Sequence, residues 1–108
     1  MKLAPRLLAV LGVTLALGAC SPQHHINAIF GSAAPAATRI ATCESGMNPT
    51  AVSPTNDHGL FQINAIHRDE FTRVTGQPWS SIYDPHWNSV YARHLYATQG
   101  WSPWSCKP

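Results

Sequence analysis

The sequence predicts a single small domain that is mainly α-helical, with one short loop or β-hairpin segment that gives it some α+β character. Its 108 residues are the length of one domain. Segment 33–44 repeats apolar residues at helical spacing, and segment 50–57 is rich in turn-forming residues. Segment 84–100 carries the start and stop signals of a helix.

The first helix is predicted over 33–44. Its residues at i, i+3, i+4, i+7, i+10 and i+11 fall on one helical face, and they are Ala33, Ala36, Ala37, Ile40, Cys43 and Glu44. Gly46 and Pro49 follow this pattern at once. Because neither residue continues a helix well, we expect the helix to end there.

A loop and a second helix come next. Segment 50–57 contains Pro, Ser, Thr and Asn, which predicts turns with short strands. Segment 60–63 is short and apolar, and 65–75 is predicted to be the second helix, ending at Gly76. Segment 77–83 is predicted to be irregular.

A third helix is predicted to begin at Asp84 and Pro85. Aspartate is a favourable N-cap, and proline suits the first helical position. Gly100 ends the helix. Its apolar face consists of Trp87, Val90, Tyr91 and Leu95.

Residues 1–19 have the pattern of an export signal. Lys2 and Arg6 give a basic start, 7–17 is an apolar run of eleven residues, and small residues follow. The run is too short to span a bilayer, and a buried core helix is the alternative. We therefore expect an exported protein of the cell envelope.

The charge balance excludes one class of partner. The chain has seven Lys and Arg residues and five Asp and Glu residues. Because Lys2 and Arg6 belong to the export segment, the mature chain is formally neutral with its histidines uncharged. No basic surface remains to neutralise phosphates, so nucleic acid is not an expected partner.

Three cysteines, Cys20, Cys43 and Cys106, need an explanation in an oxidising compartment because their number is odd. The motif LGAC at 17–20 resembles a bacterial lipoprotein box. This resemblance implies cleavage before Cys20 and a lipid on its sulfur, which would be the only contact with the membrane. Cys43 is then left to pair with Cys106, and closing that loop would stabilise the domain by about 4 kcal/mol.

Residues 20–35 are predicted to be a flexible tether, which leaves 36–108 as the folded domain. The segment has small residues, two prolines and the pair His24 and His25, with little apolar periodicity. Metal binding by this pair is the less favoured alternative. The other histidines lack ligand spacing, so neither a metal nor another cofactor is expected.

Glu44 is the side chain that indicates chemistry. It lies at the end of the first predicted helix, on the same face as Ile40 and Cys43. Burial among apolar groups and the negative end of the helix dipole would both raise its pKa and favour the protonated form. A protonated carboxylic acid near neutral pH can protonate a leaving-group oxygen, as glycosidases require. The alternative is a glutamate at a helix end that points into water.

A set of motifs in a fixed order identifies a family. The segments ESGMNP at 44–49, AVS at 51–53 and GLFQ at 59–62 resemble the lytic transglycosylase and lysozyme superfamily, and GWSPW at 100–104 resembles its small phage and actinobacterial members. The resemblance implies a lysozyme-like fold with helices around a sugar-binding cleft. It also implies cleavage of the β-1,4 bond between N-acetylmuramic acid and N-acetylglucosamine in peptidoglycan, with Glu44 as the acid and then the base.

Asp57 is a candidate second carboxylate. The run DHGLFQIN at 57–64 is similar to the c-type lysozymes, whose catalytic aspartate matches Asp57. The pairing of such an acid with an ionised aspartate is a standard example of tuned carboxylates. A retaining hydrolase needs this second carboxylate, whereas an anhydro-forming enzyme does not. The alternative for Asp57 is a turn-forming residue.

The resemblance also implies four substrate-binding residues. Gln62 and Asn64 would lie along the cleft, Ser53 would be the loop serine that contacts the acid, and Tyr91 would lie near the acid. Each has a structural alternative, namely backbone capping for Gln62 and Asn64, turn formation for Ser53 and core packing for Tyr91. Packing is also favoured for Trp101 and Trp104, beneath the disulfide.

These observations favour a monomeric, envelope-located enzyme that cleaves peptidoglycan glycan strands by lytic transglycosylation or lysozyme-type hydrolysis. The alternative from another class is a peptidoglycan-binding lipoprotein that keeps the fold without turnover. The presence of Glu44 argues against it, because a binding protein needs no partly buried acid.

Overall fold

The computed structural model describes residues 21–108. The predicted export signal and Cys20 lie outside the described residues. The helices are α2 (Pro22–Phe30), α3 (Ala34–Ser45), α4 (Arg68–Thr75) and α5 (Pro85–Gln99), with 3₁₀ turns at Gly31–Ala33, Ala65–His67 and Trp79–Tyr83 and strands β1 (Asp57–His58) and β2 (Ile63–Asn64).

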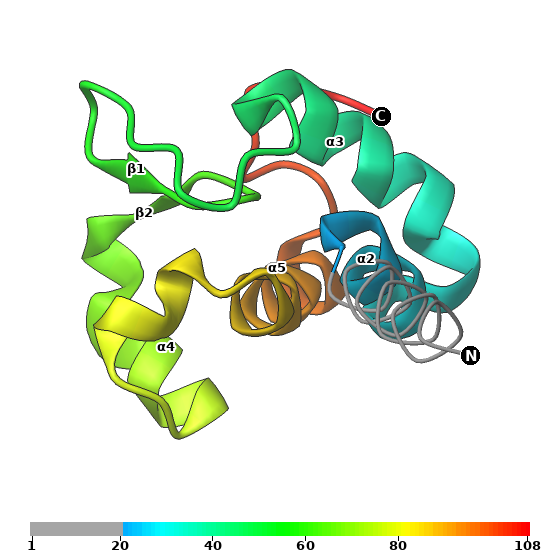
Figure 1. Ribbon diagram of the computed structural model, residues 1–108. Coiled ribbons are helices and arrows are strands. Elements are labelled where there is room, and N and C mark those ends of the chain that lie inside the picture. The colour runs from blue at the N-terminus through cyan, green and yellow to red at the C-terminus, as the bar shows by residue number, and fades with distance from the viewer. Residues whose placement is uncertain (1–20) are drawn as a thin grey trace, which may run out of the picture.

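Helix α5 occupies the centre of the domain. Figure 1 shows α2 and α3 on one side of it, and α4 with the β1–β2 hairpin on the other. Helix α2 packs against both α3 and α5, and α4 packs against α5. The core between them consists of apolar side chains from every helix, including Ile26, Phe30, Ile40, Phe71, Tyr91 and Leu95. No helix formed by residues 21–108 has both the length and the apolar character needed to cross a membrane.

The expectation of a flexible tether over 20–35 is wrong where the structure describes it. Ser21 is the N-cap of α2, because its hydroxyl accepts a hydrogen bond from the backbone N–H of His24 at 3.2 Å, and Pro22 occupies the first position. Ile26 and Phe30, one turn apart, are both buried. The folded domain therefore includes residues 21–35 as well as residues 36–108.

Helix α3 confirms the first predicted helix to within one residue at each end. Its buried positions are Ala34, Ala37, Ile40 and Ala41. Cys43 was expected on the buried face, but it is exposed, so the true face is rotated away from Cys43. Gly46 ends the helix in a left-handed conformation with φ of 65°.

The hairpin is short and is anchored to α5. Asp57 pairs with Asn64, and His58 pairs with Ile63. In the connecting turn Gly59 has φ of +80°, and a Cβ added there would lie 2.3 Å from Nδ2 of Asn88. Only glycine permits this approach. The buried Asn88 side chain accepts a hydrogen bond from the Phe61 N–H at 2.8 Å, which fixes the turn to the helix.

The second and third predicted helices are confirmed, with a qualification for the second. Residues 65–75 form the 3₁₀ turn followed by α4, and the segment expected to be irregular contains the 3₁₀ helix Trp79–Tyr83. Asp84 caps α5 as predicted, since its carboxylate accepts the His86 N–H at 2.8 Å.

The disulfide between Cys43 and Cys106 is present, with its Cα atoms 6.1 Å apart. It joins the end of α3 to the C-terminal tail, residues 101–108. Because the two cysteines are separated by 63 positions, the closed loop is long, and the cross-link stabilises the fold by about 4 kcal/mol in the chain-entropy model.

Candidate active site

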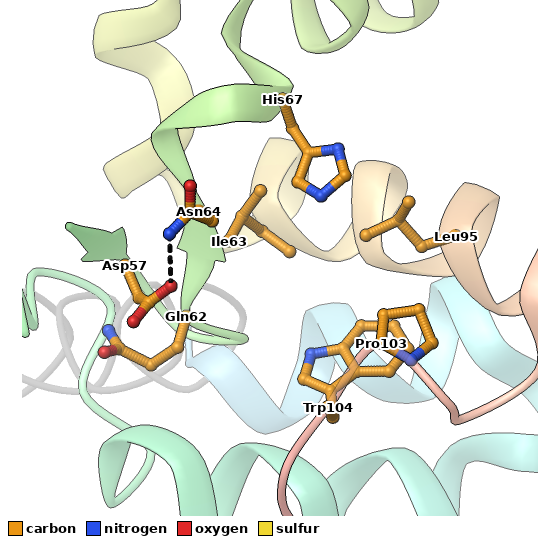
Figure 2. Close-up of a pocket in the computed structure, with 8 residues that line it drawn as sticks. All are labelled: Asp57, Gln62, Ile63, Asn64, His67, Leu95, Pro103 and Trp104. Atoms are coloured by element: carbon orange, nitrogen blue, oxygen red, sulfur yellow. Dashed lines mark hydrogen bonds between the residues drawn. The ribbon is translucent and has the colours of Figure 1, made fainter. Parts of the chain in front are cut away.

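A small cavity of about 70 Å³ opens beside the hairpin. Side chains from four parts of the chain line it, as Figure 2 shows: the hairpin, the turn before α4, helix α5 and the C-terminal tail. The lining residues are Asp57, Gln62, Ile63, Asn64, His67, Leu95, Pro103 and Trp104.

Asp57 is the carboxylate of this cavity, and both of its oxygens are hydrogen-bonded. Oδ2 accepts from the hydroxyls of Ser53 at 2.7 Å and Thr55 at 2.5 Å, and Oδ1 accepts from the amide of Asn64 at 3.0 Å. The Asn64 bond is drawn in Figure 2. The side chain is therefore fixed in place by three donors.

These donors also set the charge of Asp57. Partial burial acts to raise the pKa of the carboxyl, but the hydrogen bonds from Thr55, Ser53 and Asn64 favour the ionised form. The hydrogen bonds outweigh the burial, so the pKa of Asp57 is lowered from its ordinary value. Asp57 is consequently a stable anion in the cavity wall.

Gln62 and Asn64 line the cavity, and both amides also bind the local backbone. The Gln62 Nε2 donates to the carbonyls of Gly59 at 3.0 Å and Ala51 at 3.1 Å. Its φ of 53° is unusual for a residue other than glycine, and these two hydrogen bonds help to hold it there. The Asn64 carbonyl oxygen accepts the Ile66 N–H at 3.0 Å, so this side chain caps the following turn.

His67 forms the wall on the α4 side. Its ring extends into the cavity in Figure 2, and its Nδ1 lies 3.0 Å from the hydroxyl of Tyr91. Burial, followed by the neighbouring Glu70 carboxylate, raises the pKa of Tyr91, so its hydroxyl stays protonated. Glu70 is itself held by His94, whose Nε2 is 2.8 Å from its carboxylate. A chain of polar groups thus orients the His67 ring.

Glu44 does not line the cavity, but it contacts the C-terminal tail, which forms part of the cavity wall. It is half-buried at the end of α3, and its Oε2 accepts the backbone N–H of Cys106 at 3.1 Å. Cys106 is two residues after the cavity residue Trp104, a span of at most about 7 Å. The neighbouring Ser45 hydroxyl donates to the carbonyl of Leu60 at 2.7 Å, which fastens the end of α3 to the hairpin turn.

Two expectations about substrate-binding residues need correction. Ser53 was expected to contact Glu44, but its hydroxyl is bonded to Asp57 and Thr55 instead. The segment that carries Ser53 pairs with β1 through the bridge between Val52 and His58, and the Ser53 hydroxyl there reaches Asp57. Tyr91 was expected to bind substrate, but it is fully buried and acts on the cavity only through His67.

Five cavity-lining residues were not assigned to the site from the sequence, namely Ile63, His67, Leu95, Pro103 and Trp104, and of these His67 and Trp104 carry polar ring groups. The packing role expected of Trp104 is present, since it is 4 % exposed and its indole N–H donates to the Phe61 carbonyl at 2.9 Å. The same ring nevertheless forms part of the cavity wall. For His67 the available signal was its place three residues after Asn64, at the start of the predicted second helix.

Among residues 21–108, no group of three or more His, Cys, Asp and Glu side chains is close enough to hold a metal ion. The polar groups of the cavity are instead amides, an imidazole and a carboxylate, which suit hydrogen bonding to sugar hydroxyl and N-acetyl groups.

Comparison with protein-family models gives a match over residues 24–98, to the model described as the Transglycosylase SLT domain. The matched region covers more than half of the chain, from within α2 to the last turn of α5, and it includes Glu44 and the hairpin. No curated protein and no solved structure matches the chain.

Proposed function

Because this chain belongs to the family of SLT transglycosylase domains, whose members cleave peptidoglycan, we propose that it cuts the β-1,4 bond between N-acetylmuramic acid and N-acetylglucosamine. Family membership also confirms the expected lysozyme-like, mainly α-helical fold. The identity of the bond and of the catalytic groups is our proposal.

The position of Glu44 carries this proposal. Of the other carboxylates in residues 21–108, Glu70 is paired with His94, Asp84 caps α5 and Asp69 is exposed on α4. Two carboxylates remain: Asp57 lines the cavity, and Glu44 contacts the tail that carries the cavity residue Trp104. Since Asp57 is held as an anion by three donors, Glu44 is the group that can carry a proton to the glycosidic oxygen.

In the proposed reaction Glu44 gives its proton to the bridging oxygen while the bond from that oxygen to C1 of the muramic acid residue breaks. The electron pair of this bond stays on the leaving oxygen. The C6 hydroxyl of the same sugar then attacks C1, and its proton returns to the Glu44 carboxylate. The product is a 1,6-anhydro sugar, and Glu44 is regenerated in its protonated form.

Asp57 is proposed to stabilise the positive charge that develops at C1 rather than to form a bond. A carboxylate has about four lone-pair positions, and three donors already occupy the oxygens of Asp57. Hydrogen bonds of this kind reduce its reactivity as a nucleophile while leaving its charge in place. This is why we favour transglycosylation over a lysozyme-type covalent intermediate.

We further propose that the protein is exported, is anchored by a lipid on Cys20 and works as a monomer on glycan strands at the cell envelope. The export pattern of residues 1–19 and the LGAC motif support this location. The oxidised pair Cys43 and Cys106 is consistent with it, because disulfides persist outside the reducing cytosol.

Release of soluble fragments from purified peptidoglycan tests the proposed function. The protein beginning at Ser21 should release them, and Glu44→Gln should reduce release to background while melting at an unchanged temperature. Thr72→Ala, a substitution at an exposed position of α4, is the matched control. Binding of peptidoglycan without release by the unaltered protein would instead favour a non-catalytic binding lipoprotein.

A further inference from the structure

We propose that the C-terminal tail positions the Glu44 carboxylate through the backbone N–H of Cys106. This inference rests on the proposed catalytic role of Glu44. It concerns a segment beyond the residues that match the family model, which end at 98.

The contact between the tail and the acid is direct. The Cys106 N–H donates to Oε2 of Glu44 at 3.1 Å, across 62 positions in the sequence. Cys106 is also bonded covalently to Cys43, the residue before Glu44. The end of α3 is therefore joined to the same residue of the tail twice, once through sulfur and once through the carboxylate.

The tail is held in place independently of the disulfide. The indole N–H of Trp104 donates to the Phe61 carbonyl, and Trp104 is almost completely buried. The ring of Trp101 stacks on Tyr96 of α5, with the ring centroids 4.1 Å apart. The Lys107 ammonium donates to the carbonyls of Trp101, Ser102 and Trp104, which closes the tail on itself. Such a fixed segment can hold a donor at a defined point.

A fixed donor on one oxygen has a chemical consequence. With Oε2 engaged by the Cys106 N–H, the proton of Glu44 is left to Oε1, and the plane of the carboxyl group is restricted. After Glu44 has given up its proton, the same hydrogen bond becomes charge-assisted and therefore stronger. A donor that is positioned before the reaction stabilises the developing charge without reorganisation.

The alternative is that the tail only stabilises the fold. The two possibilities differ in their kinetic effects, because a positioning group changes kcat with little effect on KM when folding is intact. If the tail only stabilised the fold, altering it would change neither kcat nor KM of the molecules that remain folded.

A matched pair of variants separates these effects. Cys43→Ala/Cys106→Ala removes the disulfide but keeps the backbone N–H at position 106, whereas Cys43→Ala/Cys106→Pro removes both. We expect kcat to be at least about tenfold lower in the proline variant than in its alanine partner, with KM values within about twofold of each other. Equal kcat values in two folded variants would overturn the proposal.

If circular dichroism shows that the proline variant is unfolded, NMR spectroscopy of the unaltered protein decides. The amide proton of Cys106 should change its chemical shift as Glu44 titrates, and this titration should disappear in Glu44→Gln. A Cys106 amide signal that does not respond to the charge of Glu44 would overturn the proposal.

The proposal and the proposed function can fail separately. Full activity of Glu44→Gln would refute the catalytic role itself. An inactive Glu44→Gln variant, together with equal kcat values for the matched pair, would leave the catalytic role intact and refute positioning by the tail.

Discussion

The amide of Asn64 donates a hydrogen bond to the Asp57 carboxylate at 3.0 Å, and these two residues are also paired across the β1–β2 hairpin. One register position therefore fixes both the strand pairing and the orientation of the carboxylate in the cavity. The oxygen of the same Asn64 amide accepts the Ile66 N–H and so caps the turn that leads to His67. Asn64 thus connects the two polar walls of the site.

Asn64→Ala should lower stability by about 1–2 kcal/mol, because it removes a cap and a donor to a charged group. It should also raise the pKa of Asp57 towards its ordinary value, since one of the donors that favour the anion is lost. Urea denaturation measures the first effect, and carboxyl NMR measures the second. Thr72→Ala should show neither effect, and an unchanged Asp57 pKa in Asn64→Ala would mean that the Asn64 bond is not formed in solution.

The pH dependence of stability should contain a contribution from Asp57. The pKa of this carboxyl is lower in the folded state than its ordinary value, so its contribution is fully present above about pH 4. It is lost as the pH falls from there towards the folded-state value. In Asp57→Asn this part of the acid sensitivity should be missing. Unfolding experiments at pH steps between about 6 and 2 would reveal it as a difference between the two proteins that shrinks on acidification.

His67→Ala should weaken substrate binding, because the imidazole forms the cavity wall opposite the hairpin. Loss of one hydrogen bond predicts an increase in KM of about three- to tenfold with a smaller change in kcat. Thr72→Ala is the control, since Thr72 is exposed on α4 and is not among the cavity-lining residues. Equal KM values for all three proteins would show that substrate does not contact His67.

Gly59→Ala should be much more destabilising than Gly76→Ala. Both glycines have positive φ, at +80° and +71°, but only the added Cβ at Gly59 would collide with other atoms, including the Ile82 carbonyl oxygen at 2.6 Å. Backbone strain alone predicts a loss of about 1 kcal/mol at Gly76. Strain with overpacking predicts about 2–4 kcal/mol at Gly59. Similar losses of unfolding free energy for the two variants would mean that the hairpin turn shifts away from Asn88 easily.

Much of the helical fold could be predicted from local signals. The cap at Asp84 and the stops at Gly46 and Gly100 defined α3 and α5 because these signals act within a few residues. Helix α2 was missed because its nine residues bury only Ile26 and Phe30, too few to establish a periodicity. The predicted buried face of α3 wrongly included Cys43. Cys43 is exposed, and its side chain forms the disulfide with Cys106.

The candidate site was less predictable because its contacts join distant segments. Motifs identified Asp57, Gln62 and Asn64, which do line the cavity. The residues that contact Glu44 and His67 lie far away in sequence. The Cys106 N–H donates to Glu44, and the Tyr91 hydroxyl is hydrogen-bonded to His67. Nothing in local spacing reports such contacts, since they depend on how the tail and α5 pack in three dimensions.

Mass spectrometry of the fragments released from peptidoglycan by the protein and by Glu44→Gln tests the proposed reaction. We expect 1,6-anhydro muropeptides from the unaltered protein and background levels from the variant, because in the proposed reaction Glu44 carries the proton in both halves. Muropeptides with a reducing end, heavier by one water molecule, would contradict transglycosylation and make Asp57 the candidate nucleophile. Equal release by Glu44→Gln would contradict the assignment of Glu44 as the acid.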